Sequence, residues 1–285
     1  MTTATHEAID VHGVRIAYRQ AGAGTPVVFL HGNPTSSYLW RDVLGPVSTI
    51  AHCVAPDLVG MGRSGPEPAG NYRFVDHRRY VDGFLEALGL TQGVILVGHD
   101  WGGVLATDWA RRHPDAVRGI AYLETLVAPV TWDSPNAPAP ELFRRLRSAE
   151  GEQLVLEQNV FVETVLPRGI KRELTPDEHA AYRAPFLRSG ESRRPMLTWA
   201  REIPIDGTPA DVHDIVAANA AWMAVTPIPK LFVNGEPGAL LTGPLRDLCR
   251  RWPNQREVTV GGLHFLPEDS PAELAKALLD WIPTC

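Results

Sequence analysis

The feature that most constrains the fold is the alternation of short, continuous apolar runs with helical patterns. Residues 94–97, Val-Ile-Leu-Val, are the clearest run, and such runs are typical of strands buried on both faces. Similar runs lie at residues 27–30, 54–55, 120–123 and 231–233. Helical patterns separate most of them, at residues 38–47, 75–88, 103–112, 245–252 and 272–281. The sequence therefore predicts an α/β fold with a mostly parallel sheet covered by helices on both faces.

Two segments depart from this alternation. Residues 9–12 and 14–18 alternate between apolar and polar and are split by Gly13, which predicts a hairpin at the start of the sheet. Between residues 127 and 227 no strand-like run appears, and helix-like stretches at 141–147 and 211–223 are joined by Pro-rich segments. We expect this segment to form a stiff helical cap over the strand ends, where open α/β sheets bind ligands. The core would then comprise residues 1–126 and 228–285, and the cap residues 127–227.

Composition excludes several classes of protein. The chain has 27 Lys and Arg against 33 Asp and Glu, and no basic run interleaved with aromatic residues, so we expect no nucleic-acid partner. Its cysteines, Cys53, Cys249 and Cys285, lack the spacing of a disulfide framework or a zinc site and are expected to be reduced. The first eight residues lack a signal peptide's features, and no apolar run approaches the ~18 residues of a membrane span. We expect a cytoplasmic protein with no membrane partner.

The strongest catalytic signal is Gly98-His99-Asp100-Trp101-Gly102, directly after the strand at 94–97 and directly before a predicted helix. It matches the Gly-x-nucleophile-x-Gly elbow, with Asp where ester hydrolases carry Ser. The alternative is an aspartate that only caps the helix, and the two flanking glycines favour the elbow over that alternative. We therefore expect Asp100 to be a nucleophile.

An aspartate nucleophile determines the chemistry. A carboxylate with a pKa near ~3.9 is ionised at neutral pH and can displace a leaving group from a tetrahedral carbon without a base. The product is an alkyl ester on the enzyme. Water must then cleave that ester, and this step needs a general base such as a neutral imidazole.

His264 is the candidate base because it follows the last predicted strand, residues 257–260, as the chain order of this architecture requires. The base needs an acid to orient it, and both Glu124 and Glu236 come at predicted strand ends, so the residues alone leave these two open. His31 and His99 are expected to be structural. Six further histidines are expected to be solvated: His6, His52, His77, His113, His179 and His213.

Two neutral donors accompany the nucleophile. Asn33, in the loop after the strand at 27–30, carries a side-chain amide, and Trp101 carries an indole N–H. Such donors suit a departing halide, although Asn33 could simply be a turn residue and Trp101 a core residue. Residues 60–65 match the Gly-x-Gly-x-x-Gly dinucleotide motif, but Pro66 and Pro68 prevent a helix there, so we interpret them as a tight loop.

These motifs resemble those of the haloalkane dehalogenases of the α/β-hydrolase superfamily, over essentially the whole chain. The likeness is carried by residues 31–40, 98–102, 181–186, 234–240 and 264–265. It implies an eight-stranded α/β-hydrolase sheet with an inserted helical cap. It also implies Asp100 as nucleophile, His264 as base, Asn33 and Trp101 as halide donors, and Glu124 as the acid, because relatives with the other arrangement carry Asp about where this chain has Gly238.

The resemblance further implies an apolar substrate pocket. Ala200 stands where close relatives often carry Pro, which implies a roomier pocket there, and Gly169 stands at a tunnel-mouth position that is usually bulkier. The residues expected to line the pocket are Phe143, Phe161, Trp199, Ile203, Leu240 and Phe265.

The expected reaction is hydrolytic dehalogenation, with haloalkane, water and halide as the partners, a role in detoxification, and neither a metal nor an organic cofactor. We expect a monomer or a weak homo-oligomer. An epoxide hydrolase is the alternative, but it usually needs two cap tyrosines, and Tyr182 is the only tyrosine between residues 127 and 227. A haloacid dehalogenase of this fold would carry arginine beside the nucleophile, where this chain has Trp101. A non-catalytic receptor or scaffold is disfavoured because no member of the triad is missing.

Overall fold

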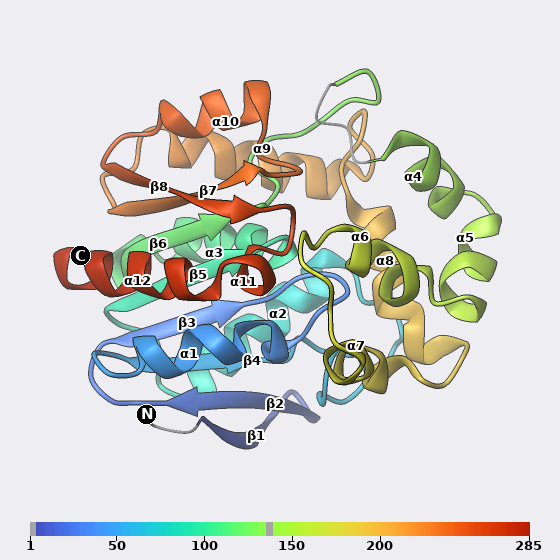
Figure 1. Cartoon of the computed structure of the whole chain (residues 1–285), viewed down its shortest axis with the longest axis horizontal. Coiled ribbons are helices and arrows are strands. Elements are labelled where there is room, and N and C mark those ends of the chain that lie inside the picture. The colour runs from blue at the N-terminus through green and yellow to red at the C-terminus, as the bar shows by residue number, and fades with distance from the viewer. Residues whose placement is uncertain (1–3, 135–138) are drawn as a thin grey trace.

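The computed structural model describes residues 4–134 and 139–285. Its centre is an eight-stranded sheet with the order β1-β2-β4-β3-β5-β6-β7-β8 (Figure 1). The strands are β1 (Thr5–Val11), β2 (Val14–Ala21), β3 (Pro26–Leu30), β4 (His52–Pro56), β5 (Val94–His99), β6 (Val117–Leu123), β7 (Lys230–Pro237) and β8 (Gln255–Gly262). Strand β2 runs antiparallel to both of its neighbours, and all the other pairs are parallel. The predicted mostly parallel eight-stranded fold is confirmed.

The buried runs of the sequence form the middle of this sheet. Residues 27–30 and 94–97 have no exposed surface, because helices cover both faces of β3 and β5. The predicted hairpin is also confirmed: Val11 pairs with Val14, and His12 and Gly13 form the turn with φ angles of 52° and 79°. The loop at residues 60–65 forms without a helix, and the N–H of Gly60 donates to the carbonyl of Gly65 at 2.9 Å.

Helices cover both faces of the sheet. On one face α1 (Arg41–Val47) packs against α12 (Pro271–Trp281), and α11 (Leu266–Asp269) lies between β8 and α12. On the other face α3 (Trp101–Arg112) packs against α2 (Phe74–Ala87) and α9 (Ala210–Met223). Helix α10 (Gly243–Arg250) connects β7 to β8.

The segment between β6 and β7 lies largely beyond the carboxyl ends of the strands, on the side to which most arrows point in Figure 1. Its helices there are α4 (Pro140–Arg147), α5 (Glu150–Glu152), α6 (Leu166–Arg168), α7 (Pro176–Arg183) and α8 (Arg194–Glu202). Two π-helical turns, Gln153–Glu157 and Phe161–Val165, lie between α5 and α6. Val130 and Ile205 form an isolated β-bridge. The boundaries of the cap at residues 127 and 227 stay a prediction.

The three cysteines carry unbridged thiols. Cys53 and Cys249 are buried and Cys285 is half-buried. Burial raises the pKa of Cys53 and of Cys249 to about 12, and that of Cys285 to about 11.

In the ranges that the structure describes, no helix has the length and hydropathy needed to cross a membrane. The same ranges hold no group of three His, Cys, Asp or Glu side chains placed to share a metal ion.

Candidate active site

Asp100 lies at the sharp turn between β5 and α3. Its backbone has φ 53° and ψ −128°, a conformation that non-glycine residues rarely adopt. The turn is possible because glycines stand two residues before and two residues after Asp100. A Cβ on Gly98 would lie 2.5 Å from the Cα of Gly103, and a Cβ on Gly102 would lie 2.1 Å from the carbonyl oxygen of Leu30. The elbow predicted from the glycine spacing is therefore built by close backbone packing.

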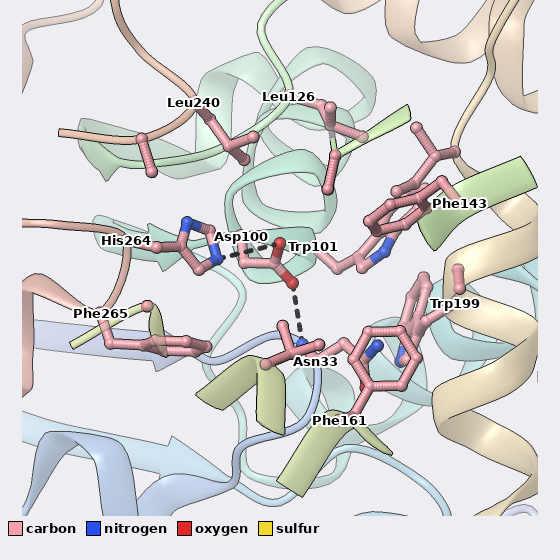
Figure 2. Close-up of a pocket in the computed structure, with 16 residues that line it drawn as sticks. Asn33, Asp100, Trp101, Leu126, Phe143, Phe161, Trp199, Leu240, His264 and Phe265 are labelled. Carbon is pink, nitrogen blue, oxygen red and sulfur yellow. Dashed lines mark hydrogen bonds and ion pairs between the residues drawn. The ribbon is translucent and has the colours of Figure 1, made fainter. Parts of the chain in front are cut away.

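The carboxylate of Asp100 faces the loop after β3 on one side and His264 on the other (Figure 2). Its Oδ1 accepts a hydrogen bond of 2.8 Å from the backbone N–H of Asn33, and its Oδ2 lies 3.6 Å from Nε2 of His264. Burial disfavours the charge on Asp100, but the interaction of its carboxylate with His264 outweighs burial and lowers the pKa of Asp100. A carboxylate with this pKa is ionised at neutral pH.

His264 follows β8 and precedes α11, and its imidazole lies between two carboxylates. Nε2 faces Asp100, and Nδ1 lies 3.5 Å from Oε2 of Glu124. Burial lowers the pKa of His264, but the two facing carboxylates of Asp100 and Glu124 outweigh burial and raise the pKa to about 9. In the resting protein the side chain of His264 is therefore a positively charged imidazolium at neutral pH.

The two candidate acids lie in different environments. Glu124, directly after β6, is fully buried, and its carboxylate accepts the backbone N–H groups of Ala239, Leu240 and Leu241 at 3.0, 2.7 and 3.3 Å. Glu236 lies within β7, its side chain is 63% exposed, and it forms an ion pair of 3.2 Å with Arg246. The structure brings Glu124 to His264 and leaves Glu236 at the surface.

The two candidate halide donors both line the cavity in front of Asp100. Trp101 occupies the first turn of α3, and its indole stacks on that of Trp199 with 4.6 Å between ring centroids. The side-chain amide of Asn33 donates one N–H to the carbonyl of Met196 on α8 at 3.2 Å. This bond fixes the orientation of the amide beside Asp100 and leaves its second N–H for a ligand.

The cavity has a volume of about 280 Å³ and mainly apolar walls. Gly169 and Ala200 line this cavity, as do the six residues predicted to line the substrate pocket: Phe143, Phe161, Trp199, Ile203, Leu240 and Phe265. Four further lining residues were not predicted: Leu126, Ala139, Val165 and Ala239. Val165 lies one helical turn after Phe161 and Ala239 precedes Leu240, so these two could have been found from spacing, whereas Leu126 and Ala139 lie in an irregular connection.

The prediction that His77 is solvated is wrong. His77 is fully buried on α2 and stacks on Trp199 with 4.1 Å between ring centroids, and burial lowers its pKa to about 3. The helical spacing of Phe74, His77 and Phe84 places all three on the buried face of α2. This spacing could have predicted the burial of His77, but the many polar residues of the helix suggested a solvated histidine. Of the other histidines expected to be solvated, His6 and His113 are exposed. Three are only half-exposed: His52, His179 and His213.

His31 and His99 are structural, as expected. Nδ1 of His31 is 2.9 Å from the carbonyl oxygen of Gly32, and Nε2 accepts the N–H of Leu58 at 2.9 Å. Nε2 of His99 is 2.9 Å from the carbonyl oxygen of His264. Both rings therefore brace the loops around the cavity.

Comparison with known proteins agrees with this geometry. A family model described as the alpha/beta hydrolase fold matches residues 25–271. The chain is 51% identical over 277 residues to a haloalkane dehalogenase from Sphingobium indicum, which covers 96% of this chain and 94% of the relative. It is 44% identical over 281 residues to a haloalkane dehalogenase from Mycolicibacterium smegmatis, covering 96% of this chain and 89% of the relative.

Among solved structures, the haloalkane dehalogenase DbeA from Bradyrhizobium elkani USDA94 superposes with a TM-score of 0.93 at 40% identity, covering 99% of this chain and 98% of that chain. Sequence and structure therefore agree over nearly the full length. The chain belongs to the haloalkane dehalogenases within the α/β-hydrolase fold family.

Proposed function

We propose that this protein hydrolyses haloalkanes to an alcohol, a halide ion and a proton. The observation that carries the proposal is an ionised Asp100 in an apolar cavity of about 280 Å³, with His264 between this carboxylate and Glu124. The names of the relatives support the same reaction class.

In the first step an oxygen of Asp100 attacks the carbon that bears the halogen. The carbon–oxygen bond of an alkyl ester forms as the carbon–halogen bond breaks, and the halide leaves with the bonding electron pair. The free N–H of the Asn33 side chain and the indole N–H of Trp101 donate to the departing halide. Neutral donors suit this task because they stabilise a developing anion without neutralising Asp100 beforehand.

In the second step water cleaves the ester. His264 takes a proton from the water molecule, whose oxygen attacks the carbonyl carbon of the Asp100 ester, and the backbone N–H groups of Asn33 and Trp101 hold the oxyanion. Collapse of this intermediate releases the alcohol and restores the Asp100 carboxylate, and the proton passes to solvent. Esterification removes the negative charge of Asp100, which is one of the groups that raise the pKa of His264, so the pKa of the imidazole falls when a base is needed.

The alternative reactions lack their required groups. Tyr182, the only tyrosine between residues 127 and 227, is buried with its hydroxyl bonded to Glu268, and no tyrosine is among the described residues that line the cavity. An epoxide hydrolase would need such a phenol to protonate the ring oxygen. The described lining residues also include no arginine that could bind a haloacid carboxylate.

Further features are proposed with this function. The segment from 127 to 227 acts as the cap over the cavity, and the protein works as a monomer or a weak homo-oligomer. It acts in the cytoplasm in detoxification, without a membrane partner. Its net charge of -6 and the lack of a basic run in its sequence support the absence of a nucleic-acid partner.

The test is halide and proton release by the purified protein from 1-bromobutane and 1,2-dibromoethane, without added metal or cofactor. We expect one proton for each bromide, and no product from styrene oxide or fluoroacetate. Asp100→Asn is the matched control, because it keeps the side-chain shape but removes the nucleophile, apart from slow recovery through deamidation. Diol formation from styrene oxide with silent bromides would instead identify an epoxide hydrolase.

A further inference from the structure

The main chain of His264 is bonded to the cap. The backbone N–H groups of His264 and Phe265 both donate to the carbonyl oxygen of Gly169, at 2.9 and 3.1 Å. On the opposite side, the carbonyl oxygen of His264 is 2.9 Å from Nε2 of His99 in the elbow. The candidate base therefore lies between a cap residue and a residue adjacent to the candidate nucleophile, and its main-chain polar groups are used in holding it there.

Asp269 forms a second bridge between the loop of the base and the cap. Its Oδ2 accepts the N–H of Leu263, the residue before His264, at 2.9 Å. Its Oδ1 accepts the N–H groups of Lys171 and Arg172 in the cap, at 2.8 and 3.1 Å. A single carboxylate thus fixes the distance between the start of this loop and residues 171–172.

Arg172 extends this bridge into the core. Its Nε donates to the carbonyl oxygen of Glu268 at 2.7 Å, and its Nη2 donates to the Glu268 carboxylate at 2.5 Å. The buried Glu268 carboxylate is also bonded to Arg41 at the start of α1, at 2.5 Å, and to the hydroxyl of Tyr182 on α7. The cap, α11 and α1 therefore meet at one ionic cluster directly after the loop that carries His264.

Gly169 makes the closest approach in this contact. A Cβ at Gly169 would lie 2.7 Å from Cε2 of Phe265, so the space in front of Gly169 is filled by the Phe265 ring. The same ring packs against the imidazoles of His264 and His99, with 4.7 and 5.4 Å between centroids. At this position, which is usually bulkier in the family that the sequence resembles, the glycine lets a core residue pack on the cap.

We infer that residues 169–172 of the cap, together with Asp269, position His264, so that ester hydrolysis depends on the cap being docked on the loop of the base while halide displacement does not. Displacement uses Asp100, which lies between β5 and α3 in the core and whose carboxylate is held by the backbone N–H of Asn33 and by His264. Hydrolysis uses Nε2 of His264, and a displacement of about 1 Å in a catalytic group costs on the order of 100-fold in rate. Asp269 is in this sense a positioning residue, and the inference rests on the function proposed above.

The test separates the two steps. In Asp269→Asn, one carboxylate oxygen becomes an NH2 group that faces backbone N–H donors, which breaks one side of the bridge. With 1-bromobutane, rapid-quench measurements should give a burst of about one bromide per enzyme at close to the wild-type rate, and then steady-state turnover at least tenfold slower. Intact-mass spectrometry of the steady-state mixture should show the butyl ester on the enzyme. Arg172→Ala, at a side chain that is 35% exposed, should give the same pattern more weakly, and it decides the question if Asp269→Asn does not fold.

Glu202→Gln is the matched control. Glu202 is also a buried carboxylate that joins the cap to the core, since on α8 it accepts the N–H of Phe74 at 2.9 Å and the Nε of Arg73 at 3.2 Å, but it does not contact the loop of His264. We expect no ester to accumulate in this variant, even if its melting temperature falls as much as that of Asp269→Asn.

Two results would overturn the inference: equal loss of the burst and of steady-state turnover without ester accumulation, or unchanged turnover in Asp269→Asn. A wild-type protein that releases no bromide would instead contradict the proposed function.

Discussion

The backbone N–H of Asp100 donates a 3.2 Å hydrogen bond to the carbonyl oxygen of Glu124. The candidate nucleophile and the candidate acid are therefore joined through their main chains at the ends of the adjacent strands β5 and β6. Their side chains diverge from this bond and reach Nε2 and Nδ1 of the same imidazole. Substitution of either side chain leaves this main-chain bond in place, so the function of each carboxylate can be tested separately.

Glu124→Gln should reduce ester hydrolysis strongly, because an amide is a weaker partner for Nδ1 of His264 and turns one acceptor into a donor. The free energy of unfolding of the variant should also fall by about 1–3 kcal/mol, because three backbone N–H groups now share a poorer acceptor. The comparison is Glu236→Gln, at an exposed surface ion pair that contributes about 0–1 kcal/mol. Steady-state bromide release and urea unfolding of both variants measure these effects, and greater loss in Glu236→Gln would reverse the assignment of the acid.

His264→Phe should release about one bromide per enzyme and then stop, because Asp100 can still attack but no base activates water. Phenylalanine keeps a ring of similar size between Asp100 and Glu124, so folding should be retained. Mass spectrometry should find the alkyl group on a peptide that contains Asp100. Repeated turnover by this variant would show that His264 is not the general base.

Trp101→Phe and Asn33→Ala should both weaken bromide binding and slow the displacement step, since each removes an N–H donor next to Asp100. Loss of one such donor typically costs about 100- to 1,000-fold in rate. The stacking of Trp101 on Trp199 is largely kept by phenylalanine, so the loss in Trp101→Phe reports the indole N–H. Burst rates and bromide titration measure the effect. An unchanged burst in both variants would leave the halide without protein donors.

The pKa of His264, raised to about 9 in the folded protein from an ordinary 6.5, predicts a pH-dependent stability. Below about pH 6.5 folded and unfolded chains both hold this proton, so the stabilisation is fully present there. Between 6.5 and 9 the folded chain holds a proton that the unfolded chain has lost, so the free energy of unfolding falls as pH rises through this interval.

The pH effect should depend on Asp100. Asp100→Asn removes a charge that raises the pKa of His264, so an NMR titration of the imidazole should show a lower midpoint, and the pH dependence of urea unfolding should become shallower. An identical midpoint in the two proteins would mean that Asp100 does not set the protonation of His264.

The parts of the fold that could be predicted are those in which one local pattern determines the outcome. Fully buried parallel strands require continuous apolar runs, so the middle of the sheet was predictable from residues 27–30 and 94–97. The elbow was predictable because glycine is needed wherever backbones approach as closely as at Gly98 and Gly102.

The parts that could not be predicted depend on orientation and on the main chain. The resemblance implied Glu124 as the acid, but the residues alone left Glu124 and Glu236 open. Deciding between them without the resemblance needed the length of β7, which continues to Pro237 and leaves Glu236 in an exposed strand end instead of just after it. The hydrogen bonds from His264 and Phe265 to Gly169 join backbone atoms only. Every residue has a backbone carbonyl group, so the residue type at position 169 does not predict these bonds. Leu126 and Ala139 reach the cavity from a connection without periodicity.

The protected thiols have a chemical consequence for a protein that binds alkylating agents. Haloalkanes react with thiolates, and the thiolate, not the thiol, is the nucleophile. With a pKa of about 12, only roughly one in a hundred thousand molecules has Cys53 or Cys249 ionised at pH 7. These cysteines are therefore poor targets for the very electrophiles that the cavity admits. The expected result is that such electrophiles alkylate the proposed nucleophile, Asp100, much faster than either buried thiol.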